Sequence, residues 1–164
     1  MNIFEAITVL EQAVENPKNG LPDEIFYFIS SMTPLVNVDL LIKDREGKIL
    51  LAWRDDEYAG TGWHLPGGII RFKEKIEERI IKVAQLEIGR EVSFDKAPIE
   101  IREIIHETRS VRGHFISMLY DCFINNDLEL DNRDKKLSDS GFLMWHQEMP
   151  DNLLSCHVEY GKYF

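Results

Sequence analysis

The chain has 164 residues, 44% of them hydrophobic and 29% charged, which suits one soluble domain with a full-sized core. Its formal net charge of −10 at pH 7 excludes nucleic acid and anionic membranes as general partners, because both require a basic surface. The longest apolar run, residues 35–42, is interrupted by Asn37 and Asp39 and is far shorter than the roughly 20 residues that span a bilayer. A small anionic substrate remains compatible with this composition, since it requires only local positive charge.

The two cysteines, Cys122 and Cys156, are far apart and belong to no Cys-x-x-Cys pattern, which argues against a zinc site or a disulfide framework. The first residues, Met1 to Glu5, lack the basic and apolar regions of a secretory signal. We therefore expect a cytoplasmic protein.

Two helices are predicted at the start of the chain. The first has apolar residues at helical spacing and ends near Asn16-Pro17; these residues are Ile3, Phe4, Ile7, Leu10 and Val14. The second spans residues 23–31. Together they form an N-terminal helical extension, residues 1–32. The sequence leaves open whether this extension covers the sheet, forms a homodimer or frames a substrate.

Strands are predicted in the middle of the chain. Residues 35–42 and 48–53 flank a turn at 44–47 and form a hairpin, and a polar loop follows at 55–62. Residues 99–108 and 114–124 are rich in β-branched and aromatic side chains, and the loop between them carries Arg109 and Arg112. Strands that precede, separate and follow helices predict an α/β sandwich with a mixed sheet.

The end of the chain is predicted to be less regular. Residues 125–140 mix acidic and basic side chains and are expected to form a surface connection. A short strand is expected at 141–145, and a short helix at 146–154 that Pro150 interrupts.

A pair of glycines, Gly67 and Gly68, precedes an amphipathic helix and marks the candidate site. Adjacent glycines let the backbone approach a ligand closely. The helix has an apolar stripe on which Glu87 falls in phase, about three turns after Ile76. A carboxylate in phase with such a stripe requires a partner, either a structural arginine or N–H group or a bound ligand. Glu74 lies at the helix start, where an acid complements the helix dipole, and is expected to be structural or to support the site indirectly.

This region resembles the signature of the Nudix hydrolases. Counted from Gly68, the matching residues are Glu74, Ala84, Glu87 and Gly89, whereas Lys82, Val83, Leu86 and Arg90 depart from the pattern. This signature, which we call the box, has fewer glutamates than the family pattern. In this respect it is similar to that of the GDP-mannose mannosyl hydrolase branch, and the similarity extends over residues 32–164. The resemblance implies a Nudix-like α-β-α sandwich at residues 33–164.

The resemblance also implies a set of site residues. It places Mg²⁺, with Mn²⁺ as the alternative ion, on Gly67, Glu87 and Asp139, and it gives Glu87 and Asp139 the catalytic roles. Ser140 stands at the position of the branch's histidine base. Further residues are candidates for substrate binding, either because they match a substrate-contacting position of the branch or because they could substitute for one. These residues are Asp39, Arg54, Arg71, His106 and His114.

Three functions compete on this basis. The first is a Mg²⁺-dependent hydrolase of a nucleoside diphosphate sugar, GDP-mannose-like, or of a related nucleoside diphosphate derivative, cleaving either at the anomeric carbon or at the P–O–P bridge. The second is a catalytically weak Nudix-fold protein that binds such a nucleotide as a sensor. The third, a plain interaction module, requires the geometry of the glycine pair and Glu87 to be incidental.

Overall fold

The computed structural model describes residues 2–124 and 130–164. Three helical segments come first: α1 (Ile3–Ala13), a 3-10 turn η1 (Pro17–Asn19) and α2 (Asp23–Ser30). Four strands follow: β1 (Leu35–Lys43), β2 (Ile49–Asp56), β3 (Gly60–His64) and β4 (Gly67–Ile69). The remaining elements are α3 (Ile76–Val83), η2 (Ala84–Ile88), β5 (Ser93–Phe94), β6 (Glu100–Ile105), β7 (His114–Phe123), β8 (Leu143–His146) and η3 (Val158–Tyr163).

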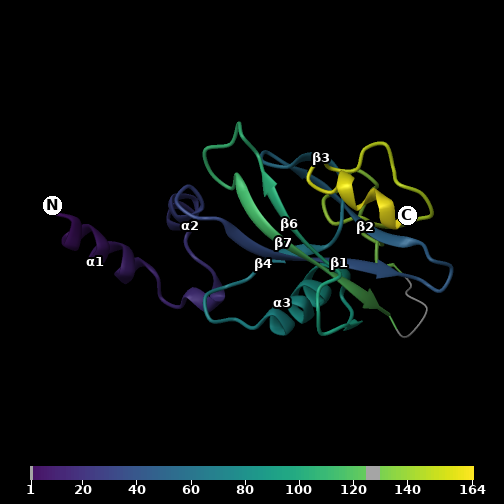
Figure 1. The fold of residues 1–164 in the computed structure, drawn as a ribbon, viewed down its shortest axis with the longest axis horizontal. Helices are drawn as coiled ribbons and strands as arrows, with labels where there is room; N and C mark the ends of the chain where they lie inside the picture. Colours follow the sequence, from purple (N-terminus) through teal and green to yellow (C-terminus); the bar gives the residue numbers. More distant parts are fainter. Residues whose placement is uncertain (1, 125–129) are drawn as a thin grey trace.

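The strands form a mixed sheet, as predicted. Strand β1 runs parallel to β7 along its whole length, from Leu35 to Lys43, and pairs with β2 in the opposite direction only at Lys43 and Ile49. Strands β1 and β2 therefore diverge, and β4 pairs with β1 in the fork between them (Figure 1). This topology places the glycine pair of β4 beside residues 37–39 of β1.

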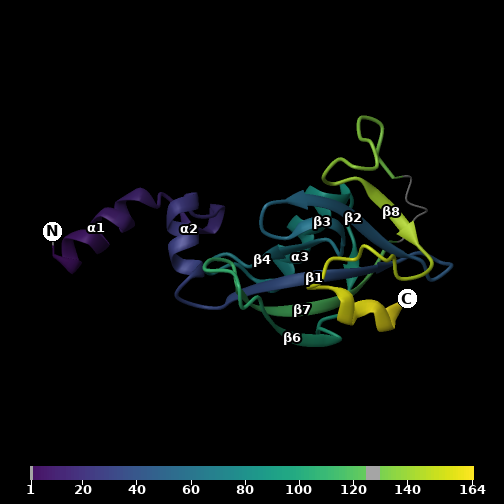
Figure 2. The same cartoon turned by 90° about the horizontal axis from the view of Figure 1, so that it is seen from above.

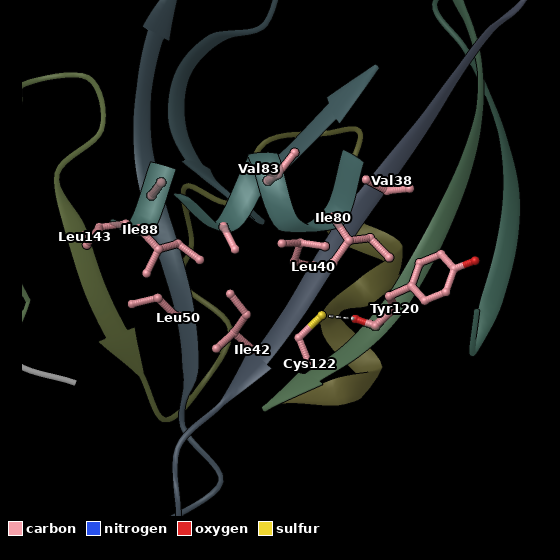
Figure 3. Close-up of a cluster of buried hydrophobic side chains, with 12 residues drawn as sticks. Val38, Leu40, Ile42, Leu50, Ile80, Val83, Ile88, Tyr120, Cys122 and Leu143 are labelled. Atoms are coloured by element: carbon pink, nitrogen blue, oxygen red, sulfur yellow. Dashed lines mark hydrogen bonds between the residues drawn. The ribbon is translucent and has the colours of Figure 1, made fainter. Parts of the chain in front are cut away.

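Each face of the sheet carries its own core because side chains alternate along β1. Val38, Leu40 and Ile42 face α3 and join the first cluster, which Figure 3 shows between α3 and strands β1, β2 and β7. Leu41 faces the opposite side, where the C-terminal segment contributes Tyr160 to a second cluster. Helical segments on both faces of a mixed sheet confirm the predicted α-β-α sandwich.

The two N-terminal helices differ in how they meet the domain. Helix α1 projects from one end of the body, and none of its residues is buried (Figures 1 and 2). Helix α2 lies against the body and buries Ile25 and Ser30. In the part of the chain that the structure describes, no helix is long and apolar enough to cross a membrane.

Three local expectations differ from the structure. The predicted loop at 55–62 is shorter, since β2 runs to Asp56 and β3 begins at Gly60. The predicted helix at 146–154 is wrong. This segment forms a bend and a turn, and it is held beside β3 because Trp63 donates its N–H to Asn152 and accepts one from Leu154. The 3-10 turn η3 was not expected, and residues 125–129 of the predicted surface connection lie outside the described residues.

Candidate functional site

The glycine pair has no room for side chains. A Cβ atom on Gly67 would collide with the carboxylate of Asp39, which pairs with it across β1 and β4. A Cβ atom on Gly68 would lie 2.8 Å from Cγ2 of Val83 on α3. The glycines thus allow β4 to fit between a buried carboxylate on one side and the helix on the other.

The helix behind the pair begins with an ion-pair cluster around Glu74. The Glu74 carboxylate is 2% exposed, and its oxygens lie 2.7 Å from Nη2 of Arg79 and 2.8 Å from Nζ of Lys82. It also accepts the N–H of Arg71 at 2.9 Å. Burial opposes ionisation, but these hydrogen bonds outweigh it and lower the pKa of Glu74 to about 2. The cluster uses Glu74 for structure, in line with its predicted role.

Glu87 lies at the other end of the same helical segment, in the π-helical turn η2 that Gly89 closes with a φ of 72°. Its Oε1 is 3.4 Å from the N–H of Gly67, and its Oε2 is 3.6 Å from Nε2 of His64. The side chain is 31% exposed. Among the described residues Glu87 therefore has only these two long contacts, which leaves its carboxylate able to take a ligand. Single π turns inside helices often occur at functional sites.

Asp39 forms the centre of a buried network on the opposite side of the pair. Ser117 and Tyr160 donate their hydroxyls to Oδ2 of Asp39, the latter at 3.3 Å, and Asn37 donates to Oδ1 at 3.0 Å. Burial raises the pKa of Asp39 to about 6, and the two hydroxyl bonds limit this rise. Asp39 therefore changes charge close to neutral pH.

His157 completes the network as a neutral ring. Its Nδ1 accepts the N–H of Leu65 at 3.0 Å, so the ring proton is on Nε2, which lies 3.7 Å from Oδ2 of Asp39. Burial lowers the pKa of His157 to about 3, with smaller contributions from His64 and Arg54. The ring therefore presents a donor, not a positive charge, to Asp39 at neutral pH.

A cavity of about 180 Å³ opens above this network, and we call it the arginine cavity. Asp39 and Gly67 lie in its lining together with Cys156, whose pKa burial raises to about 11, so that the thiol stays protonated. Burial and the charge of Arg109 lower the pKa of His106, which makes that ring neutral at pH 7. The positive charge of the lining comes from Arg54, Arg109 and Arg112. Such a surface fits an anion of the diphosphate class.

Helix α2 fixes the position of Arg112 in this lining. The backbone of Arg112 has a φ of 52°, which is uncommon outside glycine, and its N–H donates to Oγ of Ser30 at 3.1 Å. Its guanidinium lies 4.8 Å from the ring centroid of Tyr58 and 5.9 Å from that of Phe26. Of the three roles left open for the N-terminal helices, α2 therefore serves to frame the cavity.

A second cavity of about 360 Å³ lies between α2 and the box helix, by which we mean α3 and η2 together, and we call it the helix cavity. It shares Gly67, Gly68, Ile69 and Arg112 with the arginine cavity. Its own lining includes Arg71 and Glu87. The two cavities therefore meet at the glycine pair, with arginines in both linings and the Glu87 carboxylate in that of the helix cavity.

The structure brings together six of the eight predicted site residues. Asp39, Arg54, His106 and Gly67 line the arginine cavity, and Arg71 and Glu87 line the helix cavity together with Gly67.

The other two lie elsewhere in the described chain. Asp139 is exposed and accepts the N–H of Lys136 at 2.8 Å, and the neighbouring Ser140 bonds to the backbone of Asp55. His114 pairs with Glu103 across β6 and β7 at 3.1 Å. Neither Asp139 nor His114 lines the two cavities.

Sequence reasoning gave no role to Ser117 or Tyr160. Both reach Asp39 from distant parts of the chain, 78 and 121 positions away. The signal for Ser117 was a single small hydroxyl within an apolar strand, because a polar group in such a place requires a buried partner.

The donor set beside the glycine pair fits a divalent cation. The Glu87 carboxylate accepts the N–H of Gly67 only at 3.4 Å, is 31% exposed and lines the helix cavity. Among the described residues no group of three or more His, Cys, Asp or Glu side chains gathers to form a complete metal cage. A single carboxylate with backbone and substrate oxygens is the arrangement that Mg²⁺ uses when it is bound together with phosphates.

Comparisons with known proteins agree with this fold. No protein-family model matches the chain. The low-salt glycan biosynthesis protein Agl8 of Haloferax volcanii is 30% identical over 128 residues, which cover 75% of this chain and 81% of that protein.

Two solved structures share the fold at low identity. The MutT NUDIX hydrolase from Burkholderia pseudomallei aligns with a TM-score of 0.62 and 18% identity over 80% of this chain and 98% of its own. The MutT protein from Methanosarcina mazei Go1 aligns with a TM-score of 0.60 and 17% identity, over 79% and 92% of the two chains. The chain belongs to the same family as Agl8, and its domain has the Nudix hydrolase fold.

Proposed function

We propose that the protein is a divalent-metal-dependent hydrolase of a nucleoside diphosphate sugar or a related nucleoside diphosphate derivative. The carrying observation is that two cavities meet at Gly67 and Gly68. Arginines line both of them, and the Glu87 carboxylate lines one. A diphosphate bound across the pair would contact both.

The side chains divide the work in this proposal. Arg54, Arg109 and Arg112 bind the phosphate oxygens, because charge-assisted hydrogen bonds to phosphate are the strongest that side chains form. Glu87 and the backbone carbonyl of Gly67 would hold Mg²⁺ or Mn²⁺, and the ion would supply neutralisation of the developing diphosphate charge. Asp39 accepts a hydrogen bond from a sugar hydroxyl, as its match in the sequence implies. Its location in the cavity supports this role.

Three residues retain proposed roles with less structural support. Arg71 lines the helix cavity and is placed to support the leaving diphosphate. His106 faces the arginine cavity as a neutral ring that can bind a substrate hydroxyl. Asp139 would join Glu87 as a ligand only after the 130–141 connection moved, because in the structure it bonds within its own turn.

The sugar part of the substrate is proposed from the Agl8 relative. That protein's name places it in glycan biosynthesis, where activated sugars are consumed. We propose GDP-mannose-like sugars as the first compounds to test and the cytoplasm as the location. Both cysteines are unpaired, which is consistent with a reducing compartment.

The test is a panel of sugar nucleotides with and without Mg²⁺, followed by phosphorus NMR of the products. Free nucleoside diphosphate plus sugar would identify anomeric cleavage, and monophosphate products would identify bridge cleavage. No turnover of any compound in the presence of Mg²⁺ or Mn²⁺ would contradict the hydrolase proposal.

The second candidate is a nucleotide sensor, and two observations favour it. Val83 packs into the core where the Nudix signature has a glutamate, and Leu86 is exposed at the position of another. Ser140 stands where the branch has its histidine base, and it lies outside both cavities, so this position supplies no general base. Saturable binding of a sugar nucleotide without turnover would select this candidate.

A homodimer remains part of the proposal, and α1 is where we expect the contact. Ile3 and Phe4 are 71% and 79% exposed, and copies of α1 would cover them in a dimer. Light scattering of the chain with and without residues 1–16 tests this assignment.

A further inference from the structure

His64 is a buried imidazole that the fold leaves without a satisfactory partner. It ends β3, is 8% exposed and lines the arginine cavity. Its Nδ1 has no hydrogen-bond partner among the described residues. Its Nε2 lies 3.6 Å from Oε2 of Glu87, which is longer than a hydrogen bond. Nε2 is therefore open to a ligand, and an ion bound there would leave the ring proton on Nδ1.

The spacing between His64 and Glu87 suits two ligands of one metal ion. Imidazole nitrogens and carboxylate oxygens bind such ions at about 2.0–2.2 Å, which separates two tetrahedral ligands by about 3.4 Å. The observed 3.6 Å between Nε2 and Oε2 is close to that separation. The other oxygen of Glu87 lies 3.4 Å from the backbone nitrogen of Gly67.

We propose that His64 is a nitrogen ligand to the divalent ion that Glu87 holds, and that it makes the site prefer a first-row transition ion over Mg²⁺. The proposal rests on the metal dependence of the proposed function and adds a ligand to that site. Mg²⁺ takes oxygen ligands almost exclusively, whereas imidazole binds transition ions well. One nitrogen and one carboxylate therefore favour ions such as Mn²⁺ or Co²⁺.

The test uses the full chain with Co²⁺ as the probe. Co²⁺ bound to His64 should shift the exchangeable N–H proton of that ring in the proton NMR spectrum, because the ion is paramagnetic. His64→Phe should abolish the shifted signal and weaken Co²⁺ binding at least about tenfold, the lower end of the effect of disturbing a metal ligand's surroundings. Mg²⁺ affinity should change by less than about threefold, since Mg²⁺ gains little from nitrogen.

The matched control is His146→Phe. His146 lies on β8, packs its ring against Trp63 with centroids 4.5 Å apart, and lines neither cavity. This variant should keep the shifted signal and the Co²⁺ affinity of the wild type. If His64→Phe does not fold, His64→Gln replaces it.

Three outcomes would overturn the inference: the shifted signal persists in the folded His64 variant, Co²⁺ affinity is unchanged in it, or the wild type shows no shifted signal. In that last case His64 and Glu87 are only a structural pair. Sugar-nucleotide hydrolysis is measured separately. If the wild type hydrolyses a sugar nucleotide and His64→Phe keeps the Co²⁺ affinity of the wild type, the ligand role is refuted and the proposed function stands. If the wild type shows the shifted signal but hydrolyses no sugar nucleotide, the ligand role stands and the proposed function is refuted.

Discussion

The acidic residues of the site fall into two regions with opposite surroundings. At the start of the box helix, Glu74 is buried against Arg79 and Lys82. Beside the glycine pair, Asp39 receives only neutral donors, and Glu87 has two long contacts. The first region satisfies its carboxylate within the fold. In the second region neutral donors hold Asp39 within the fold, whereas Glu87 is left with long contacts among the described residues, and this difference separates a structural acid from one that can take a ligand.

The largest effect expected from this comparison is that of Glu87→Gln. It should lower metal-dependent hydrolysis by at least about 100-fold, because metal stabilisation of transition-state charge is worth several kcal/mol. The melting temperature should change little, since Glu87 is 31% exposed and makes only long contacts. Initial rates at saturating Mg²⁺ measure the effect, and equal Mg²⁺ affinity in variant and wild type would sink the assignment.

The second prediction concerns Glu74 at the other end of the helix, where we expect the substitution to lower the stability of the fold. Glu74→Gln should destabilise the fold by about 3 to 5 kcal/mol, the cost of removing one partner from a buried ion pair. It leaves Arg79, which is 8% exposed, without its counter-charge. Urea denaturation measures the loss.

The pH dependence supplies a control for Glu74. Its pKa is about 2 in the fold against an ordinary 4.5, so its stabilisation is present above pH 4.5 and is lost as the pH falls toward 2. The difference between wild type and variant should shrink over that range. A difference that is constant with pH would show that the carboxylate charge is not the cause.

The third prediction concerns the cost of keeping Asp39 in the cavity. Its pKa is about 6 in the fold against an ordinary 3.8, so the group favours the fold below pH 3.8 and this advantage is lost as the pH rises through 6. Asp39→Asn cannot ionise. Its stability relative to wild type should therefore improve by roughly 3 kcal/mol between pH 3.5 and pH 8, at 1.36 kcal/mol per pKa unit.

Denaturation curves at the two pH values measure this change. The variant should also bind substrate more weakly, which is the expected trade between stability and function at a binding site. If the stability difference between Asp39→Asn and the wild type is the same at both pH values, the fold does not raise the pKa of Asp39.

The fourth prediction tests the arginine cavity. Arg54→Ala should weaken binding of a nucleoside diphosphate by about 1.5–3 kcal/mol, the range for a hydrogen bond to a charged group. Arg133→Ala is the matched control, because Arg133 is exposed and pairs only with Asp131 among the described residues. An unchanged dissociation constant in the Arg54 variant would remove this residue from the site.

Much of the fold could be predicted because its signals are local. Helical spacing located α1, and the apolar stripe of the helix after the glycine pair, with Ile80 and Val83 buried, follows the predicted phase. The turn at residues 44–47 fixed the β1–β2 hairpin. The helix prediction for residues 146–154 was wrong because the backbone of this segment bonds to Trp63, a partner about 90 residues away that no local pattern reveals.

The candidate site shows the same division. Gly67 and Glu87 could be predicted because they are close in sequence and share a signature. Ser117 and Tyr160 could not, since they meet Asp39 only through the parallel pairing of β1 with β7 and the return of the C-terminal segment. Asp139 was assigned from the resemblance alone, and a matched position carries no information about how the 130–141 connection turns.

The most direct test is calorimetric titration of a nucleoside diphosphate into the wild type, Glu87→Gln and Glu74→Gln, each with Mg²⁺ and with a chelator. It measures ligand binding whether the protein is a hydrolase or a sensor. We predict binding that Mg²⁺ strengthens in the wild type and in folded Glu74→Gln, and that Mg²⁺ no longer strengthens in Glu87→Gln. Equal Mg²⁺-dependent binding in Glu87→Gln and the wild type would contradict the claim that the carboxylate beside the glycine pair serves a ligand.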